Sequence, residues 1–104
     1  MILKEKIIQD IENTPIILYM KGTKERPACG FSTKVVSVLN SHSVMYQDVN
    51  VLADPEIRVR LSEHSNWPTI LQLFVNGALI GGCEIVMEME SSGRLNDILA
   101  EAGT

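Results

Sequence analysis

Cys29 is the residue of this chain whose position best suits chemistry. It lies between the apolar run Ile16–Met20, which is typical of a buried strand, and a helical pattern in which Val35, Val36 and Leu39 share one face. At the start of a helix, a thiol feels a partial positive charge and meets backbone N–H groups that have no partner in the helix. Both effects favour the thiolate, the form that attacks disulfides and binds metals.

Ser32 stands three positions after Cys29, where a dithiol redox centre would have its second cysteine. No disulfide can close inside this loop, so Cys29 has to act alone, with a small-molecule thiol, or with a sulfur from elsewhere. The only other cysteine is Cys83, directly after Gly81-Gly82 at the start of another helical pattern. Two interpretations of Cys83 stay open: a small residue that packs the turn against the helix, or a resolving thiol for Cys29.

Several short motifs occur in a fixed order around this thiol. They are Lys21-Gly22-Thr23, Pro27-Ala28-Cys29-Gly30-Phe31-Ser32, Asn66-Trp67-Pro68-Thr69 and Gly81-Gly82-Cys83. In this order and at this spacing they resemble the monothiol glutaredoxins, a branch of the thioredoxin fold. The similarity runs from Ile16 to about Leu99. It implies an α/β thioredoxin fold, with a four-stranded mixed sheet and helices on both faces, and glutathione as a cofactor.

A glutathione site needs cations or helix N-termini for two carboxylates, and open backbone for the peptide groups. Lys21 and the planar guanidinium of Arg58 suit carboxylates, and glycines before a helix leave N–H groups open to an anion. The resemblance implies the individual contacts. Lys21 and Arg58 would hold the glycine carboxylate, the backbone of Thr69 and Ile70 would meet the cysteinyl unit, and Gly82, Cys83 and Glu84 would hold the γ-glutamyl end; Phe31, next to the thiol, is also expected at the site.

Two residues depart from the pattern of the family. Glu84 replaces the usual aspartate, so the carboxylate reaches one methylene further. Leu71 replaces a proline whose peptide bond is cis in proteins of this fold. A cis bond before a non-proline residue costs about 2.5–4 kcal/mol, against roughly 0.5–1 kcal/mol before proline. We therefore predict a trans Ile70–Leu71 bond, with the backbone of Thr69 and Ile70 displaced from the orientation that pairs with glutathione.

We expect structural roles for the remaining residues whose side chains could bind a metal or stack on a ligand. His42 and His64 are expected on the surface or on helix faces, and Trp67 is expected to pack beside the site. A zinc site built from the two cysteines and the two histidines would lack any standard ligand pairing. We therefore predict no such zinc site.

Composition narrows the class of protein. The chain has 104 residues, 45% of them hydrophobic, and a formal net charge of −4. This size predicts one domain, residues 1–104, and the acidic balance argues against nucleic acid as a partner. The first residues lack the apolar core of a signal peptide, and no segment has the length of a membrane span. Two cysteines and no export signal favour a reducing compartment: the cytoplasm, or an organellar matrix if a leader has been removed.

The elements that position these motifs follow from periodicity and from helix-end signals. Asp54-Pro55-Glu56 is a helix start, with Asp as N-cap and Pro at the first helical position, and Asn76-Gly77 is a two-residue hairpin signal. The predicted helices are 3–13, 30 to about 40–43, 55–65, 83–92 and a short last helix through 95–102. The predicted strands are 16–20, 45–50, 70–75 and 78–80.

Two classes of function use such a thiolate. In iron–sulfur carriage, one Cys29 and one glutathione from each of two subunits supply the four sulfurs of a [2Fe–2S] cluster. The resemblance implies this role, with a homodimer when loaded and a mainly monomeric apo form, iron–sulfur acceptor proteins and BolA-like proteins as partners. In the alternative, an oxidoreductase, Cys29 takes glutathione from mixed disulfides. The five residues between Thr23 and Cys29 favour carriage by resemblance. A non-catalytic interaction module is the third interpretation.

Overall fold

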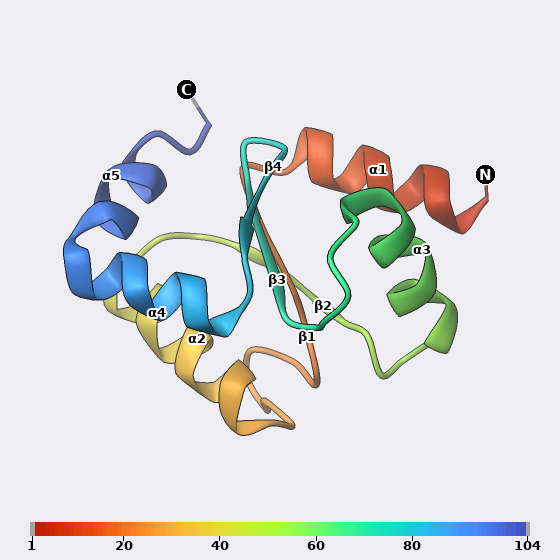
Figure 1. Ribbon diagram of the computed structural model, residues 1–104, viewed down its shortest axis with the longest axis horizontal. Coiled ribbons are helices and arrows are strands. Elements are labelled where there is room, and N and C mark those ends of the chain that lie inside the picture. Colours follow the sequence, from red (N-terminus) through yellow and green to blue (C-terminus); the bar gives the residue numbers. More distant parts are fainter. Residues whose placement is uncertain (1, 104) are drawn as a thin grey trace.

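The computed structural model describes residues 2–103, in which helices and strands alternate along most of the chain (Figure 1). In chain order the elements are α1 Leu3–Asn13, β1 Ile16–Met20, α2 Gly30–Ser41, β2 Gln47–Asn50, α3 Pro55–Ser65, β3 Gln72–Val75, β4 Ala78–Gly81, α4 Cys83–Ser92 and α5 Arg94–Ala100. In this part of the chain no helix combines the length and the apolar character that crossing a membrane requires.

The sheet has the strand order β2–β1–β3–β4. β1 pairs parallel to β2 and antiparallel to β3, and β3 and β4 form an antiparallel hairpin. The turn of this hairpin places Asn76 at φ 51° and Gly77 at φ 83°, which is the backbone that a tight two-residue turn requires. The predicted four-stranded mixed sheet is thus confirmed.

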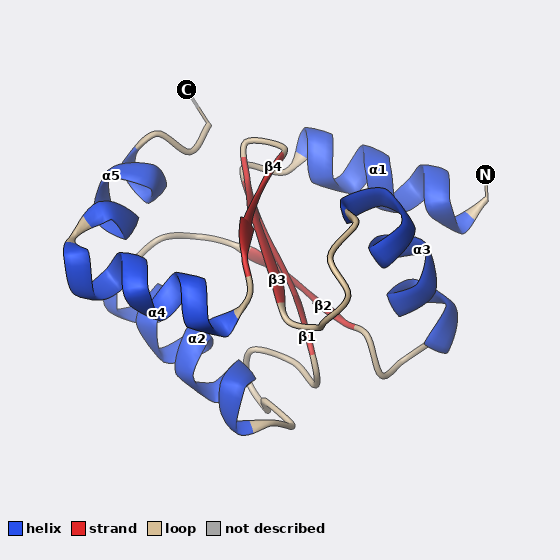
Figure 2. Cartoon of the chain, viewed as in Figure 1, coloured by secondary structure: helices blue, strands red, loops and turns tan. Residues whose placement is uncertain are grey.

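Helices cover both faces of the sheet, as predicted. α2, α4 and α5 lie on one face, and α1 and α3 lie on the other (Figure 2). Alternate side chains of β1 pack against the helices on the two faces of the sheet, because successive residues of a strand point to opposite faces. Ile16, Leu18 and Met20 belong to the core under α2, α4 and α5, whereas Ile17 and Tyr19 belong to the core under α1 and α3.

The ends of α3 follow the signals in the sequence. The Asp54 side chain accepts a hydrogen bond of 3.0 Å from the N–H of Glu56, and Pro55 is the first helical residue. Asn66 ends the helix in the left-handed region, at φ 56°. After Asn66 the chain leaves the helix and continues as residues 67–71, the segment that leads to β3.

Two predicted strand starts are wrong by two residues, and one strand end by one residue. β2 begins at Gln47 rather than at Met45, because Ile17 is the first residue of β1 that pairs with it. β3 begins at Gln72 rather than at Ile70, because residues 67–71 form a loop of their own. β4 extends to Gly81, which pairs with Leu73.

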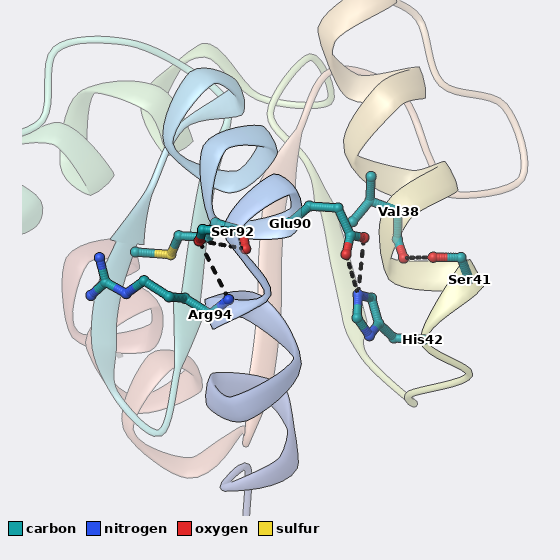
Figure 3. A network of polar contacts seen from close by, with 7 residues as sticks. Val38, Ser41, His42, Glu90, Ser92 and Arg94 are labelled. Atoms are coloured by element: carbon teal, nitrogen blue, oxygen red, sulfur yellow. Dashed lines mark hydrogen bonds and ion pairs between the residues drawn. The ribbon is translucent and has the colours of Figure 1, made fainter.

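His42, expected on the surface or on a helix face, is the C-cap residue of α2 and makes a contact that the sequence did not predict. Its side chain is only 14% exposed, and its Nε2 lies 3.0 Å from both carboxylate oxygens of Glu90 (Figure 3). His42 follows α2 and Glu90 lies in α4, so the contact joins these helices at the ends distant from Cys29. The two residues are 48 positions apart in the sequence, so no local sequence pattern predicts their contact.

Candidate functional site

Cys29 is the N-cap residue of α2, with an extended backbone at φ −150° and ψ 146°. The pKa of its thiol is lowered, chiefly by the backbone N–H of Ser32. The N–H of Phe31, the charge of Lys21 and the Ser32 hydroxyl act in the same direction, while partial burial opposes them. The direction agrees with the expectation for a thiol at a helix start. The half-buried Cys29 is therefore set up as a nucleophile or as a metal ligand.

Residues 21–28, which we call the thiol loop, form a small hairpin between β1 and Cys29. Gly22 and Pro27 make an isolated antiparallel bridge, and the N–H of Ala28 donates to the carbonyl of Lys21 at 2.9 Å. Thr23 and Arg26 exchange backbone hydrogen bonds of 3.2 and 3.0 Å. The five residues after Thr23 are therefore folded back on the chain in a closed turn.

Side chains of β2 and the residue before it hold the thiol loop in place. The Oδ1 of Asn50 accepts from the N–H of Gly22 at 2.9 Å, and the Oδ2 of Asp48 accepts from the N–H of Lys24 at 2.9 Å. The Lys24 ammonium donates to the carbonyl of Tyr46 at 2.9 Å and lies 4.8 Å from the centre of its ring. The loop that carries Cys29 is thus attached to the neighbouring strand.

A cavity of about 370 Å³ opens between the N-terminus of α4, the segment 67–71 and Phe31. This volume lies within the range of small-ligand sites. Its lining residues are Phe31, Trp67, Thr69, Ile70, Leu71, Gly82, Cys83, Glu84 and Ile85. Of the residues proposed from the sequence, the cavity brings together Phe31, Thr69, Ile70, Gly82, Cys83 and Glu84.

The other proposed residues, Cys29, Lys21 and Arg58, lie outside the lining. Lys21 is half-buried and acts electrostatically on Cys29, which begins the helix that presents Phe31. Arg58 is exposed on α3 and does not line the cavity. Ile85 lines the cavity but was missed from the sequence, although its place two residues after Cys83, in the first turn of α4, could have suggested it.

Residues 67–71, which we call the cavity loop, present backbone to the cavity. Every peptide bond described is trans, so the Ile70–Leu71 bond is trans, as predicted. The predicted displacement of Thr69 and Ile70 from the orientation that pairs with glutathione stays a prediction. In the described part of the chain, neither the N–H of Ile70 nor the N–H of Leu71 meets an acceptor. The indole Nε1 of Trp67 is buried and also lacks a partner there. The cavity is therefore bordered by N–H donors that a ligand carbonyl or carboxylate could use.

Gly82 lets the cavity loop approach the start of α4 closely. A Cβ on this residue would lie 3.1 Å from the carbonyl oxygen of Leu71 and 3.5 Å from Nε1 of Trp67. Gly82 is the N-cap of α4, and no side chain caps that helix end. The first backbone N–H groups of α4, at the end of the helix that borders the cavity, therefore have no capping side chain. Such free N–H groups suit an anion.

Cys83 differs from Cys29 in its electrostatics. Burial raises the pKa of its thiol, the nearby Lys34 lowers it, and the charges of Cys29 and Glu84 raise it further. Cys83 is therefore near enough to Cys29 to feel its charge, but it is the less acidic thiol. Among the residues described, no group of three or more histidine, cysteine or acidic side chains could hold a metal ion.

Comparisons with known proteins relate this arrangement to one family. The family model described as Glutaredoxin matches residues 16–80. A protein of Rickettsia conorii named probable monothiol glutaredoxin 2 is 48% identical over 93 residues, which cover 89% of this chain and 87% of that protein. Monothiol glutaredoxin-5, mitochondrial, of Saccharomyces cerevisiae is 48% identical over 101 residues, which cover 93% of this chain and 67% of that protein.

A solved structure extends the similarity to the whole fold. The solution structure of reduced poplar apo GrxS14 superposes with a TM-score of 0.84 at 39% identity. The superposition covers 96% of this chain and 92% of the poplar protein. The thioredoxin fold expected from the sequence is confirmed.

Proposed function

Since this chain belongs to the glutaredoxin family, in its monothiol branch, we propose that it is a glutathione-dependent carrier of [2Fe–2S] clusters. Members of this branch are known for that role. The observation that carries the proposal is one thiol with a lowered pKa at a helix N-terminus, two residues before Phe31, which lines a cavity bordered by free backbone donors. Such a site suits a thiol-bearing peptide that completes the ligand set of Cys29.

Glutathione fits the donors that surround the cavity. In the proposed contacts the N–H groups at the start of α4, at Gly82 and Cys83, hold the γ-glutamyl carboxylate, and Glu84 meets the ammonium group. The cavity loop pairs with the cysteinyl unit, and Lys21 and Arg58 hold the glycine carboxylate. Bound in this way, glutathione supplies a second thiolate beside Cys29.

The cluster is cargo in this proposal, and its ligands come from two subunits. A [2Fe–2S] cluster takes four sulfur ligands, and the described residues of one chain include no group of three or more histidine, cysteine or acidic side chains that could hold a metal ion. One Cys29 and one glutathione from each of two copies make up four sulfurs. We therefore propose a homodimer with the cluster between the subunits and a mainly monomeric apo form.

An alternative function uses the same thiolate as a nucleophile. Cys29 would attack the glutathione sulfur of a mixed disulfide, which releases the substrate thiolate and leaves glutathione bound to Cys29 by a disulfide. The thiolate of a second glutathione would then attack that glutathione sulfur, which frees Cys29 and forms oxidised glutathione. The lowered pKa of Cys29 favours this chemistry as well, so activity has to be measured beside cluster loading.

The partners and the location belong to the same proposal. We propose iron–sulfur acceptor proteins and BolA-like proteins as partners. The yeast relative is named as mitochondrial, and the proposed location of this protein is the cytoplasm or an organellar matrix.

Anaerobic reconstitution with iron, sulfide and glutathione tests the proposed function. The loaded protein should show the visible spectrum of a [2Fe–2S] cluster and elute as a dimer that contains two glutathiones. Cys29→Ser should abolish loading, whereas the matched control Cys83→Ser should retain most of it, because Cys83 is not a proposed ligand of the cluster and serine keeps the backbone N–H that is proposed to contact glutathione. A cluster that forms without glutathione, or that survives in Cys29→Ser, would contradict the proposal.

A further inference from the structure

Gln72 is a fully buried amide directly below the cavity loop. It is the first residue of β3, its side chain is 0% exposed, and its Nε2 donates to the carbonyls of Trp67 at 3.1 Å and Thr69 at 3.0 Å. Carbonyl oxygens only accept, so the atom between them has to be the NH₂ group. One side chain of the sheet thus ties down two carbonyls of the loop.

This contact determines where the next peptide group points. The C=O and N–H of a trans peptide group point in opposite directions. Because the Thr69 carbonyl turns toward Gln72, the N–H of Ile70 turns away from it. In the described part of the chain this N–H has no acceptor, and Ile70 lines the cavity. Gln72 therefore helps to keep one backbone donor available to a peptide ligand.

The same amide contributes little net stability to the fold. Its Oε1 is buried and has no partner in the structure described. An unmatched buried acceptor costs about as much as the two hydrogen bonds from Nε2 contribute. An apolar side chain of similar length would avoid that cost, so the two donated bonds matter mainly for the orientation of the loop.

We propose that Gln72 is a positioning residue for glutathione: it holds the cavity loop so that the Ile70 N–H donates to the peptide backbone of the cysteinyl unit. The inference rests on the proposed function, since it takes glutathione as the ligand. It assigns the amide a role in peptide recognition and none in the acidity of Cys29. The causes of that acidity lie in α2 and Lys21, with no contribution from Gln72.

Gln72→Met is the test, because methionine keeps the length of the side chain and removes both donors. Gln47→Met is the matched control, since Gln47 is also the first residue of a strand but is exposed. Calorimetric titration with glutathione should give about tenfold weaker binding for Gln72→Met, and no change for Gln47→Met. A thiol-free tripeptide, γ-glutamyl-alanyl-glycine, should lose the same factor, because the contact is to the backbone.

Two further measurements separate positioning from a purely structural role. The pH profile of Cys29 alkylation should stay that of the wild type in Gln72→Met. The amide NMR signals of Ile70 and Leu71 should shift or broaden while those of β4 stay unchanged. If Gln72→Met does not fold, Gln72→Glu replaces it; a carboxyl donates one bond when it is neutral and none when it is ionised, so this variant should also bind glutathione more weakly than the wild type.

The outcomes distinguish the inference from the function on which it rests. Folded Gln72→Met with wild-type affinity overturns the inference and leaves the proposed function standing. A shifted alkylation profile would also overturn it, because the whole site would then have changed. A wild-type protein that binds no glutathione overturns the proposed function, and the inference with it.

Discussion

Replacing Asn50 by alanine should detach the thiol loop from the sheet at its most buried anchor. The Oδ1 of Asn50 accepts two hydrogen bonds of 2.9 Å, from the N–H groups of Gly22 and Leu52. Gly22 is buried, so its N–H cannot exchange the lost acceptor for water. Leu52 is 58% exposed, and water can replace its lost bond.

The expected loss follows from this difference. A buried donor left without an acceptor costs about 1–3 kcal/mol, and the exposed donor costs little. The free energy of unfolding of Asn50→Ala should therefore fall by about 2 kcal/mol. For a domain of this size, that loss lowers the melting temperature by roughly 8–16 °C. A typical domain stability of about 5–15 kcal/mol leaves the variant folded.

Urea unfolding followed by circular dichroism measures this loss, and Asn50→Asp is the control. Aspartate keeps an acceptor at the same position, so its stability should stay within about 0.5 kcal/mol of the wild type. The pKa of Cys29 should remain lowered in Asn50→Ala, because its largest cause is the backbone N–H of Ser32 in α2. Equal stabilities of Asn50→Ala and wild type would refute the reasoning.

Four further predictions concern the thiols, the backbone and the proposed ligand contacts. Because the pKa of Cys29 is lowered and that of Cys83 is raised, iodoacetamide at pH 7 should label Cys29 first, as mass spectrometry would show; preferential labelling of Cys83 would contradict this assignment. Arg58→Ala should weaken glutathione binding by about 1.5–3 kcal/mol, the range for a hydrogen bond to a charged group, and the variant should still fold. Unchanged affinity by calorimetry would mean that Arg58 is only a solvated charge and does not hold glutathione. Gly22→Ala should destabilise the fold by more than about 2 kcal/mol in urea, since φ is 85° and a Cβ would lie 2.5 Å from a backbone carbonyl oxygen; a neutral effect would mean that the loop can move aside. Leu71→Pro should bind glutathione more tightly than the wild type, because a cis bond costs only roughly 0.5–1 kcal/mol before proline and would give Thr69 and Ile70 the backbone orientation that pairs with glutathione; equal affinity in titrations would count against this.

The sequence alone determined the local features of this protein. Helix starts and turns depend on residues that are close in the chain, so Asp54-Pro55 and Asn76-Gly77 mark their boundaries where the structure has them. The lowered pKa of Cys29 is also local, because its largest cause is the N–H of Ser32, three residues on. The order of these elements agrees with the fold that the resemblance implied, a mixed sheet with helices on both faces.

Only the tertiary structure decided which distant groups meet. The cavity combines Phe31, the loop before β3 and the first turn of α4, and no local rule states how these segments converge. Asn50 reaches Gly22 across 28 positions, and His42 reaches Glu90 across 48. The direction of the Gln72 amide follows from its burial beneath the cavity loop. In each case the packing between elements determines the partner, since most buried polar groups bond to an acceptor or donor that the fold places beside them.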